Sequence, residues 1–300
     1  MAKTHVPAQH RKVRVWPVFR FLILFGLCFV ILYPLLYMLS NAFRDPADMS
    51  DPTVLWIPRN LSLRPLRDVL RIMDFWPTLL RTLLLNGGCA LVQVCSGALT
   101  GYGFARFHFR GQKLLFGIVI LMILVPEQII LIPQYMQFQR FGLINSDLTM
   151  YLPAAMGNGV RSGLMILIFR QFFKGLPREL EDAACLDGCG PLQTFLRIMV
   201  PNAASAFLTV FLFSVVWYWN DSYVSSVFFT SNHTIALTVK NLKPLLNLYL
   251  FNDATVQVSM REQIVWFEAA CPLSILPLLL IYVCLQKYFT EGIARAGLVA

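Results

Sequence analysis

Long apolar stretches constrain the fold of this chain more than any other feature. A membrane-spanning helix needs about 20 predominantly apolar residues. Six stretches approach or reach that length, at 21–40, 83–104, 114–133, 151–169, 203–219 and 264–282. Hydrophobic residues make up 57% of the chain and charged residues 14%, against roughly 45–50% and 25% in soluble domains. We therefore predict an all-α, polytopic membrane protein with six transmembrane helices, forming a single transmembrane domain over residues 21–300.

The first 20 residues form a basic segment without a single acidic residue. Positive charges beside a membrane span are retained on the cytoplasmic side, so segment 1–20 is predicted to be cytoplasmic. The apolar run that follows is longer than the core of a cleaved signal peptide, which predicts a retained first span. Nucleic-acid binding is the alternative for such a basic segment, but its position beside a span favours a role in orientation. No nucleic-acid partner is expected.

One polar stretch of about thirty residues, 170–201, separates the fourth and fifth spans. Acidic residues follow Pro177 directly, and both features favour the first turn of a helix. The helix is expected to continue to Leu186 and to end at Gly188, because glycine readily adopts the left-handed cap conformation. A second helix is expected over Pro191–Met199, ending at Pro201. The stretch therefore predicts a cytoplasmic helix-turn-helix loop lying against the membrane.

This loop resembles the coupling loop of ABC-importer permeases. The family pattern is Glu-Ala-Ala, three residues, Gly, nine residues, an apolar position, one residue and Pro. Here the matching residues are Asp182, Ala183, Ala184, Gly188, Ile198 and Pro201. Asp182 is one methylene shorter than the Glu of the pattern but keeps its charge.

Further matches extend the resemblance over nearly the whole chain, and they are similar to the smaller permease of maltose-type carbohydrate importers. They are GYGFARFHFRGQKLLFG at 101–117, Val125-Pro126, Leu131-Ile132-Pro133, RQFF at 170–173, Trp219-Asn220-Asp221 and Gln286-Lys287-Tyr288-Phe289.

The resemblance implies an ATP-driven, binding-protein-dependent importer in the cell membrane of a bacterium or archaeon. The implied partners are a second permease subunit in a heterodimer, two ATPase subunits, an extracytoplasmic solute-binding protein, membrane lipid and a sugar or oligosaccharide. The binding protein is expected to meet the loops at 45–81, 134–149 and 230–261. The residues expected to couple to the ATPase are Glu179, Asp182, Ala183, Ala184, Leu186, Asp187, Gly188 and Pro201.

Helix breakers and polar residues interrupt two consecutive spans, the third at Pro126 and the fourth at Gly157–Gly163. Irregular backbone is tolerated in a membrane only where it lines a cavity or is buried in protein. Together with one residue at the end of the fifth span, these interruptions supply the candidates for the solute pathway. They are Glu127, Gln128, Asn158, Arg161 and Asn220. The sixth span is also expected to be interrupted, by Glu268, Pro272 and Pro277.

Glu127 and Arg161 have two interpretations besides an error in their predicted depth. They form an ion pair that fixes helix packing, or Arg161 meets an acidic or hydroxylated solute. The two charges suggest a solute other than a plain neutral glucan. The amide side chains have the same ambiguity, because polar groups also hold membrane helices together.

No pattern for catalysis, a phosphate-binding loop or a metal site is present. Cys185 and Cys189 lack the companion ligands that a zinc site needs, and no cofactor is predicted. The chain is therefore not expected to be an enzyme, and any ATP hydrolysis would take place in a separate subunit. The alternative function is an ion-coupled secondary transporter that uses Glu127 and Glu268.

Overall fold

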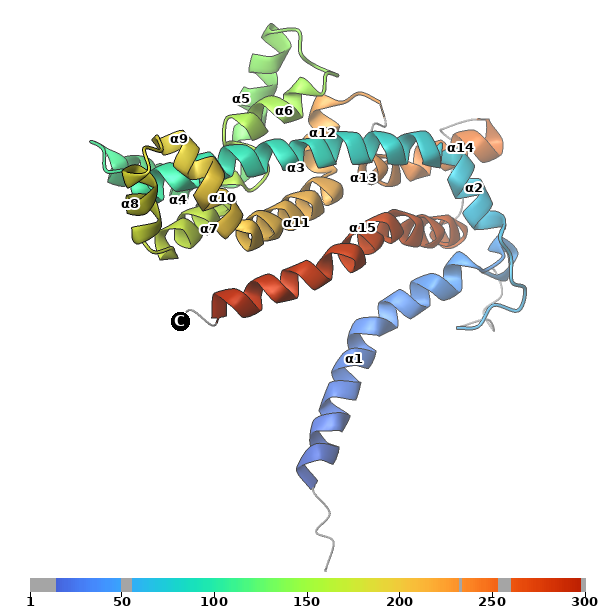
Figure 1. The fold of residues 1–300 in the computed structure, drawn as a ribbon. Coiled ribbons are helices and arrows are strands. Elements are labelled where there is room, and N and C mark those ends of the chain that lie inside the picture. Colours follow the sequence, from blue (N-terminus) through green and yellow to red (C-terminus); the bar gives the residue numbers. More distant parts are fainter. Residues whose placement is uncertain (1–14, 50–55, 232–233, 253–259, 298–300) are drawn as a thin grey trace, which may run out of the picture.

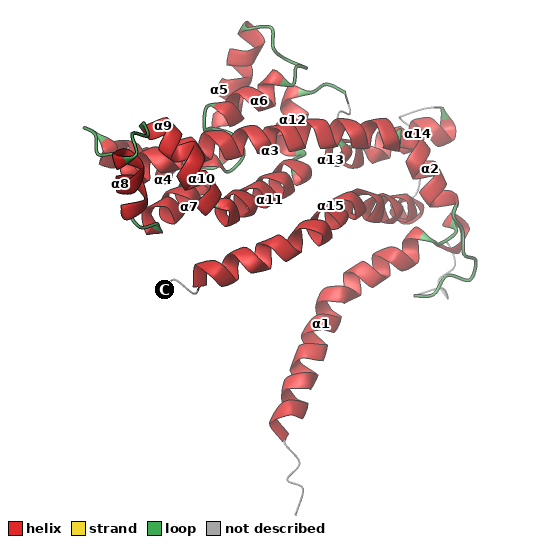
Figure 2. Cartoon of the chain, in the orientation of Figure 1, coloured by secondary structure: helices red, strands yellow, loops and turns green. Residues whose placement is uncertain are grey.

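The computed structural model describes residues 15–49, 56–231, 234–252 and 260–297, and these ranges are mainly helical (Figure 2). Within them the only β-type pairing is a single bridge between Arg44 and Leu61. Long helices α3 (Phe75–Arg106), α11 (Ala204–Asn220) and α15 (Met260–Gly297) pack alongside one another (Figure 1). Helix α1 (Val15–Ala42) contacts α15 and diverges from the bundle toward its N-terminus. The predicted all-α, polytopic fold is confirmed.

The other helices are shorter and connect or cover the long ones. They are the 3-10 helix η1 (Pro46–Met49), α2 (Arg64–Ile72), α4 (Gln112–Leu124), α5 (Glu127–Arg140), α6 (Leu148–Ala155), α7 (Ser162–Gly175), α8 (Glu179–Leu186), α9 (Pro191–Thr194), the π-helix η2 (Phe195–Met199), α10 (Val200–Asn202), α12 (Tyr223–Phe228), α13 (Ile235–Lys240) and α14 (Leu242–Phe251).

Three helical segments of the described chain are long and apolar enough to cross a membrane alone: Trp16–Ala42, Phe75–Arg106 and Gln263–Lys287. Two bent pairs, α4 with α5 and the α9–α10 segment with α11, raise the number to five if each pair is one crossing. The remaining predicted span, 151–169, falls on α6 and α7. Neither helix is long enough to cross alone, so a sixth crossing requires the two to act as one broken span.

Several predicted span limits differ from the helices. Helix α1 is described from Val15, six residues before the predicted start, while residues 1–14 of the basic segment lie outside the described part of the chain. Helix α3 begins at Phe75 instead of residue 83. The sixth span was expected to be interrupted by Pro272 and Pro277, but α15 continues through both. A proline removes one helical hydrogen bond, and in lipid the neighbouring backbone groups have no better partners than those of the helix itself.

The third predicted span, 114–133, is not one straight helix but is broken near Pro126, where the sequence indicated an interruption. Helix α4 ends at Leu124 and α5 begins at Glu127, with a bend of 102° between them. Proline disfavours the α conformation in the residue before it, and Val125 is extended with φ −75° and ψ 124°. Figure 1 shows α5 and α6 projecting to one side of the long helices.

The fourth predicted span is likewise broken. Helix α6 ends at Ala155 and α7 begins at Ser162. Gly157 and Arg161 have positive φ values of 71° and 55° between them, which are incompatible with a continuous right-handed helix. Both interruptions that the sequence indicated are therefore present.

Helices α3 and α7 approach each other closely at a small residue of α3. A Cβ atom added at Gly101 would lie 2.6 Å from Phe169 Cβ and 2.9 Å from the Arg170 backbone nitrogen. Small residues allow membrane helices to approach to backbone contact, which compensates for the missing hydrophobic drive between helices in lipid.

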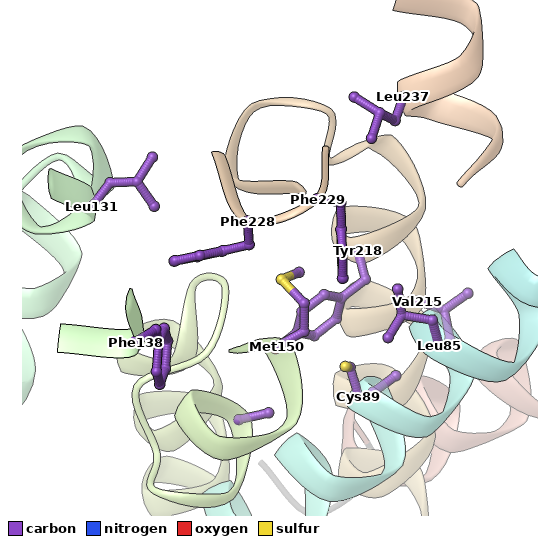
Figure 3. Packing of buried hydrophobic residues seen from close by; sticks show 12 residues of the cluster. Leu85, Cys89, Leu131, Phe138, Met150, Val215, Tyr218, Phe228, Phe229 and Leu237 are labelled. Carbon is purple, nitrogen blue, oxygen red and sulfur yellow. The ribbon is translucent and has the colours of Figure 1, made fainter. Parts of the chain in front are cut away.

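The central apolar cluster joins α3, α6, α11 and α12. In Figure 3, Tyr218 and Met150 lie together, with Cys89 and Val215 on one side of them and Phe228 on another. All five side chains are at most 5% exposed. This cluster fixes the position of the two broken spans against α3 and α11.

The end of the molecule opposite α8 is covered by α2, α13 and α14 (Figure 1). The buried side chains of Leu242 and Leu246 belong to one apolar cluster with residues of α2 and α15. In the segment before α2, the Asp48 carboxylate accepts two hydrogen bonds from Asn60, one from its backbone N–H (2.9 Å) and one from its side-chain amide (3.2 Å). These hydrogen bonds lower the pKa of Asp48. Because α13 and α14 pack here, the described part of the loop 230–261 lies mainly against the bundle. Residues 232–233 and 253–259 of this loop lie outside the described chain.

Replacing Gly101 by Ala is expected to lower the free energy of unfolding by about 1–3 kcal/mol, because the new methyl group overpacks the α3–α7 contact. The measurement is thermal unfolding of the purified chain in detergent. Gly103→Ala is the matched control, because it lies two residues away and its Cβ would have no neighbour within 4 Å. Equal melting temperatures for the two variants would contradict this account of the contact.

Candidate functional site

The polar loop 170–201 contains the helix that the sequence predicted, with α8 extending over Glu179–Leu186. Its C-terminus closes in a Schellman motif. The Gly188 N–H donates to the Cys185 carbonyl (3.0 Å) and the Cys189 N–H donates to the Ala184 carbonyl (2.9 Å). Gly188 has φ +82°, as expected for the residue that ends the helix. The second predicted helix is more irregular, because α9 passes into the π-helix η2.

Most of the residues expected to contact an ATPase lie on the surface of this loop. Leu186 is 90% exposed at the end of α8, and Asp182, Ala183 and Gly188 are also exposed. Ala184 is the exception at 2% exposed, and α8 packs against α9 and η2. We therefore assign Ala184 to packing within the loop. The other predicted coupling residues are exposed, namely Glu179, Asp187 and Pro201.

Glu181 joins α8 to the end of α3. The Tyr102 hydroxyl donates to Glu181 Oε1 at 2.8 Å, and Arg106 Nε lies 3.2 Å from Glu181 Oε2. The Arg106 guanidinium also donates to the Leu176 carbonyl at 2.7 Å. The Arg106 side chain is 6% exposed, so this ion pair is shielded from water and stronger than a surface pair.

Aromatic packing anchors the second half of the loop at the same place. Rings of Tyr102, Phe173 and Phe195 form a cluster with centroid distances of 5.0–6.0 Å. All three residues are buried, and Met199 beside them in the same cluster is fully buried. The loop is therefore fixed to both α3 and α7.

Sequence reasoning identified the exposed face of this loop but missed its anchor. Tyr102 and Arg106 lie within the motif that carried the family resemblance, but neither was singled out. Glu181 was interpreted only as an acid favoured by the helix dipole. A signal was present, because an arginine at the end of an apolar span and an acid in a following loop are candidates to pair.

A cavity lies where the two broken spans meet α11 and α12. Three of the five predicted pathway residues line it, namely Glu127, Asn158 and Arg161. The other two do not: Gln128 is exposed elsewhere on α5, and Asn220 borders a separate cavity near α13 and α15. The nearby residues that the prediction missed are Gly159, Ser162 and Tyr218.

Glu127 and Arg161 lie together at this cavity. Glu127 Oε1 accepts a hydrogen bond from the Arg161 backbone N–H (3.0 Å) and lies 3.9 Å from Arg161 Nε. Glu127 is the first residue of α5, and Arg161 is the N-cap of α7. One carboxylate therefore sits close to the N-termini of both helices, where the helix dipole favours negative charge. The Arg161 side chain remains 56% exposed.

The non-helical turn between α6 and α7 is held by a buried polar network. Gln93 Nε2 donates to the Val160 carbonyl (2.9 Å) and to Ser214 Oγ (3.3 Å). The Tyr218 hydroxyl donates to Gln93 Oε1 (2.7 Å) and accepts from the Val160 N–H (3.3 Å). At the end of α6, Ser96 Oγ donates to the Ala154 carbonyl at 2.6 Å. Side chains of α3 and α11 thus replace the hydrogen bonds that a continuous helix would make.

None of the described residues form a group of three or more His, Cys, Asp or Glu side chains placed to hold a metal ion. Cys185 and Cys189 are both free cysteines on either side of the Gly188 turn.

Tyr218→Phe is expected to lower the free energy of unfolding by about 1–2 kcal/mol, because it leaves the Val160 N–H and Gln93 Oε1 without the hydroxyl. Thermal unfolding in detergent measures the change. Tyr249→Phe is the control, since Tyr249 is 45% exposed on α14. A Tyr218 variant as stable as this control would show that the network does not hold the turn.

Comparison with known proteins identifies the family. Residues 94–295 match the model of the binding-protein-dependent transport system inner membrane component. Protein LplC of Bacillus subtilis is 26% identical over 298 residues, covering 97% of each chain. The arabinooligosaccharides transport system permease protein AraQ of Halalkalibacterium halodurans is 23% identical, covering 95% of this chain and 99% of its own. The diacetylchitobiose uptake system permease protein DasC of Streptomyces coelicolor is 26% identical, covering 95% and 96%.

A solved structure has the same fold. It is a bacterial ABC transporter involved in the import of the acidic polysaccharide alginate, and one of its chains matches with a TM-score of 0.73 and 21% identity, covering 95% of this chain and 100% of that chain. The family and the long apolar helices together locate the protein in the cell membrane as a multi-pass transport component and not as a catalytic subunit. The chain belongs to the family of inner membrane components of binding-protein-dependent transport systems.

Proposed function

We propose that this permease imports a sugar or oligosaccharide and is driven by a separate ATPase that docks on the loop 170–201. In this proposal a second permease subunit completes the solute pathway, two ATPase subunits bind on the cytoplasmic side and an extracytoplasmic binding protein delivers the solute. The carbohydrate assignment rests on relatives named for arabinooligosaccharide, lactose and diacetylchitobiose transport.

The observation that carries the coupling assignment is the contrast between the two faces of α8. Leu186 is 90% exposed, and Leu192 and Leu196 on the second half of the loop are 64% and 57% exposed. Apolar side chains that are this exposed on a polar loop favour a protein partner. On the opposite side Glu181 is tied to Tyr102 and Arg106. The exposed surface of α8 is therefore connected to the long helix α3 through Glu181.

This arrangement supports transmission of movement as a rigid body. When the ATPase subunits close, a displacement of α8 passes to α3 through Glu181 and to α7 through the aromatic cluster of Tyr102, Phe173 and Phe195. Helix α7 begins at the cavity and ends at the loop. Movement of the loop is thus expected to shift the wall of the cavity, which biases a packing equilibrium between inward-open and outward-open states.

The contact residues that we propose are Asp182, Ala183, Leu186, Asp187 and Gly188, with Glu179 and Pro201 at the edges of the surface. Ala183 has the small side chain that close approach to a partner requires. Gly188 supplies the positive φ that ends α8 and fixes its length.

The ion-coupled alternative loses support from the geometry. Its mechanism needs intramembrane acids that release and bind ions, yet Glu127 is engaged with Arg161. Glu268, on α15, borders neither of the two cavities described above.

Gly188→Val is expected to leave the bundle folded but to weaken coupling. A β-branched residue with positive φ costs roughly 1–2 kcal/mol, which corresponds to about a tenfold loss of affinity for the docked loop. Solute uptake by cells and the melting temperature of the purified chain are measured together. Gly190→Val is the matched control, because Gly190 has φ −73° and open space around its Cβ position. Normal uptake by the Gly188 variant would overturn the role assigned to this turn.

Affinity purification from the native membrane in mild detergent tests the proposal as a whole. We expect an ATPase and a second permease as stoichiometric companions, and we expect Leu186→Asp to lose the ATPase while retaining the second permease. Leu61→Asp is the control, since Leu61 is 79% exposed in the loop before α2, and α2 lies at the end of the molecule opposite α8 (Figure 1). Recovery of a folded chain without any nucleotide-binding companion would refute ATP coupling.

A further inference from the structure

The cavity between the broken spans contains a buried hydroxyl group that the fold does not use. Ser162 is 3% exposed, and its Oγ has no hydrogen-bond partner among the described residues. Such groups are rare in folded proteins, because burying a polar atom without a partner costs free energy. Ser162 is the first residue of α7 and lines the cavity. The Ser162 hydroxyl group would gain a hydrogen-bond partner from a solute that enters the cavity.

The other polar groups around Ser162 complement one another. Glu127 and Arg161 are the only charged residues among those that line the cavity, and they are paired with each other. The carboxylate offers acceptor atoms and the half-exposed guanidinium offers donors. Asn158 on the same wall is exposed and supplies both. The cavity therefore combines donors and acceptors without net charge.

Most of the remaining lining is apolar, with Gln134 and Thr149 as polar exceptions. Leu131, Met150 and Phe228 lie on the side formed by α5, α6 and α12. A site that combines apolar walls with a few convergent polar groups is typical of small-molecule recognition. Sugar rings match such a site, since they have C–H faces and hydroxyl groups that both donate and accept.

Charge decides which class of sugar fits. The N-terminus of α7 would favour an anion, but Glu127 Oε1 already accepts from its Arg161 N–H. A solute carboxylate would find this N–H donor already occupied. It would also lie close to the negative charge of Glu127, which is unfavourable. From these observations we infer that Ser162, with Arg161, Glu127 and Asn158, forms a contact site for the hydroxyl groups of a neutral saccharide and disfavours uronate-containing ones.

This inference rests on the proposed function and refines it. In the sequence, the separate charges at positions 127 and 161 suggested a solute other than a neutral glucan. Their pairing in the structure reverses that expectation, because the cavity meets the solute with a dipole and not with a net charge.

The test uses the native host with the chromosomal gene replaced by each variant and a deletion strain as the blank. Cells receive an equimolar pool of maltotriose, xylotriose, arabinotriose, trigalacturonate and trimannuronate, and accumulated saccharides are quantified by mass spectrometry. Immunoblotting and the melting temperature of the purified complex control for expression and folding. Ser274→Ala is the matched control, since its hydroxyl bonds only to its own helix, at the Ala270 carbonyl.

We expect wild-type cells to accumulate neutral trisaccharides well above the blank and uronates only slightly above it. Ser162→Ala should lower the neutral uptake by about three- to tenfold, with unchanged protein level and with Ser274→Ala matching the wild type. Glu127→Gln leaves Arg161 uncompensated and should raise the ratio of uronate to neutral uptake by about tenfold. A purely structural role would lower all uptake without moving this ratio.

Two results would overturn the inference alone: preferential uptake of uronates by the wild type, or a Ser162→Ala variant as active as the wild type. Either leaves ATP-driven saccharide import standing. Absence of any saccharide uptake above the blank in wild-type cells would instead contradict the carbohydrate assignment of the proposed function, and this inference with it.

Discussion

The structure depends on one constraint, that backbone polar groups within a membrane must find partners inside the protein. Two spans of this chain are broken, so their freed N–H and C=O groups need substitutes. Gln93 and Tyr218 provide them at the turn before α7, and Glu127 does so at the Arg161 N–H. The breaks are possible because α3 and α11 pass close beside them and carry these polar side chains. Irregular backbone then creates the polar wall of a cavity that a bundle of straight helices would lack.

A second arrangement joins this cavity to the loop 170–201. Helix α7 extends from the cavity wall to the loop, and α3 runs beside it, in backbone-close contact at Gly101. At the end of α3, Tyr102 and Arg106 engage Glu181 on α8. The path from the proposed docking surface to the proposed solute contact therefore consists of two helices and one shielded ion pair. Because packed helices move as units rather than bending continuously, this geometry suits the transfer of a small displacement.

Much of the local structure was predictable from the sequence. The extent of α8 followed from Pro177, three early acids and Gly188, since local dipole and cap preferences are strong there and require no distant partner. The interruptions near Pro126 and Gly157 followed from the same kind of local rule. The limits of the spans were less predictable, because apolar composition does not show where a helix ends. Pro272 and Pro277 were expected to interrupt α15, yet the helix continues, which shows how the surroundings override a local preference.

The sequence by itself determined the class of protein, the long apolar helices and the exposed polar loop 170–201, because each depends on composition or on neighbouring residues. Only the tertiary structure decided which polar groups meet. It brought Glu127 to Arg161 across 34 residues and Tyr218 to Gln93 across 125, while it kept Gln128 and Asn220 away from the same cavity. These outcomes depend on the rotation of each helix about its axis and on the angle of the bend after α4. Both are set by packing among segments that are distant in the sequence, so no local pattern in the chain predicts them.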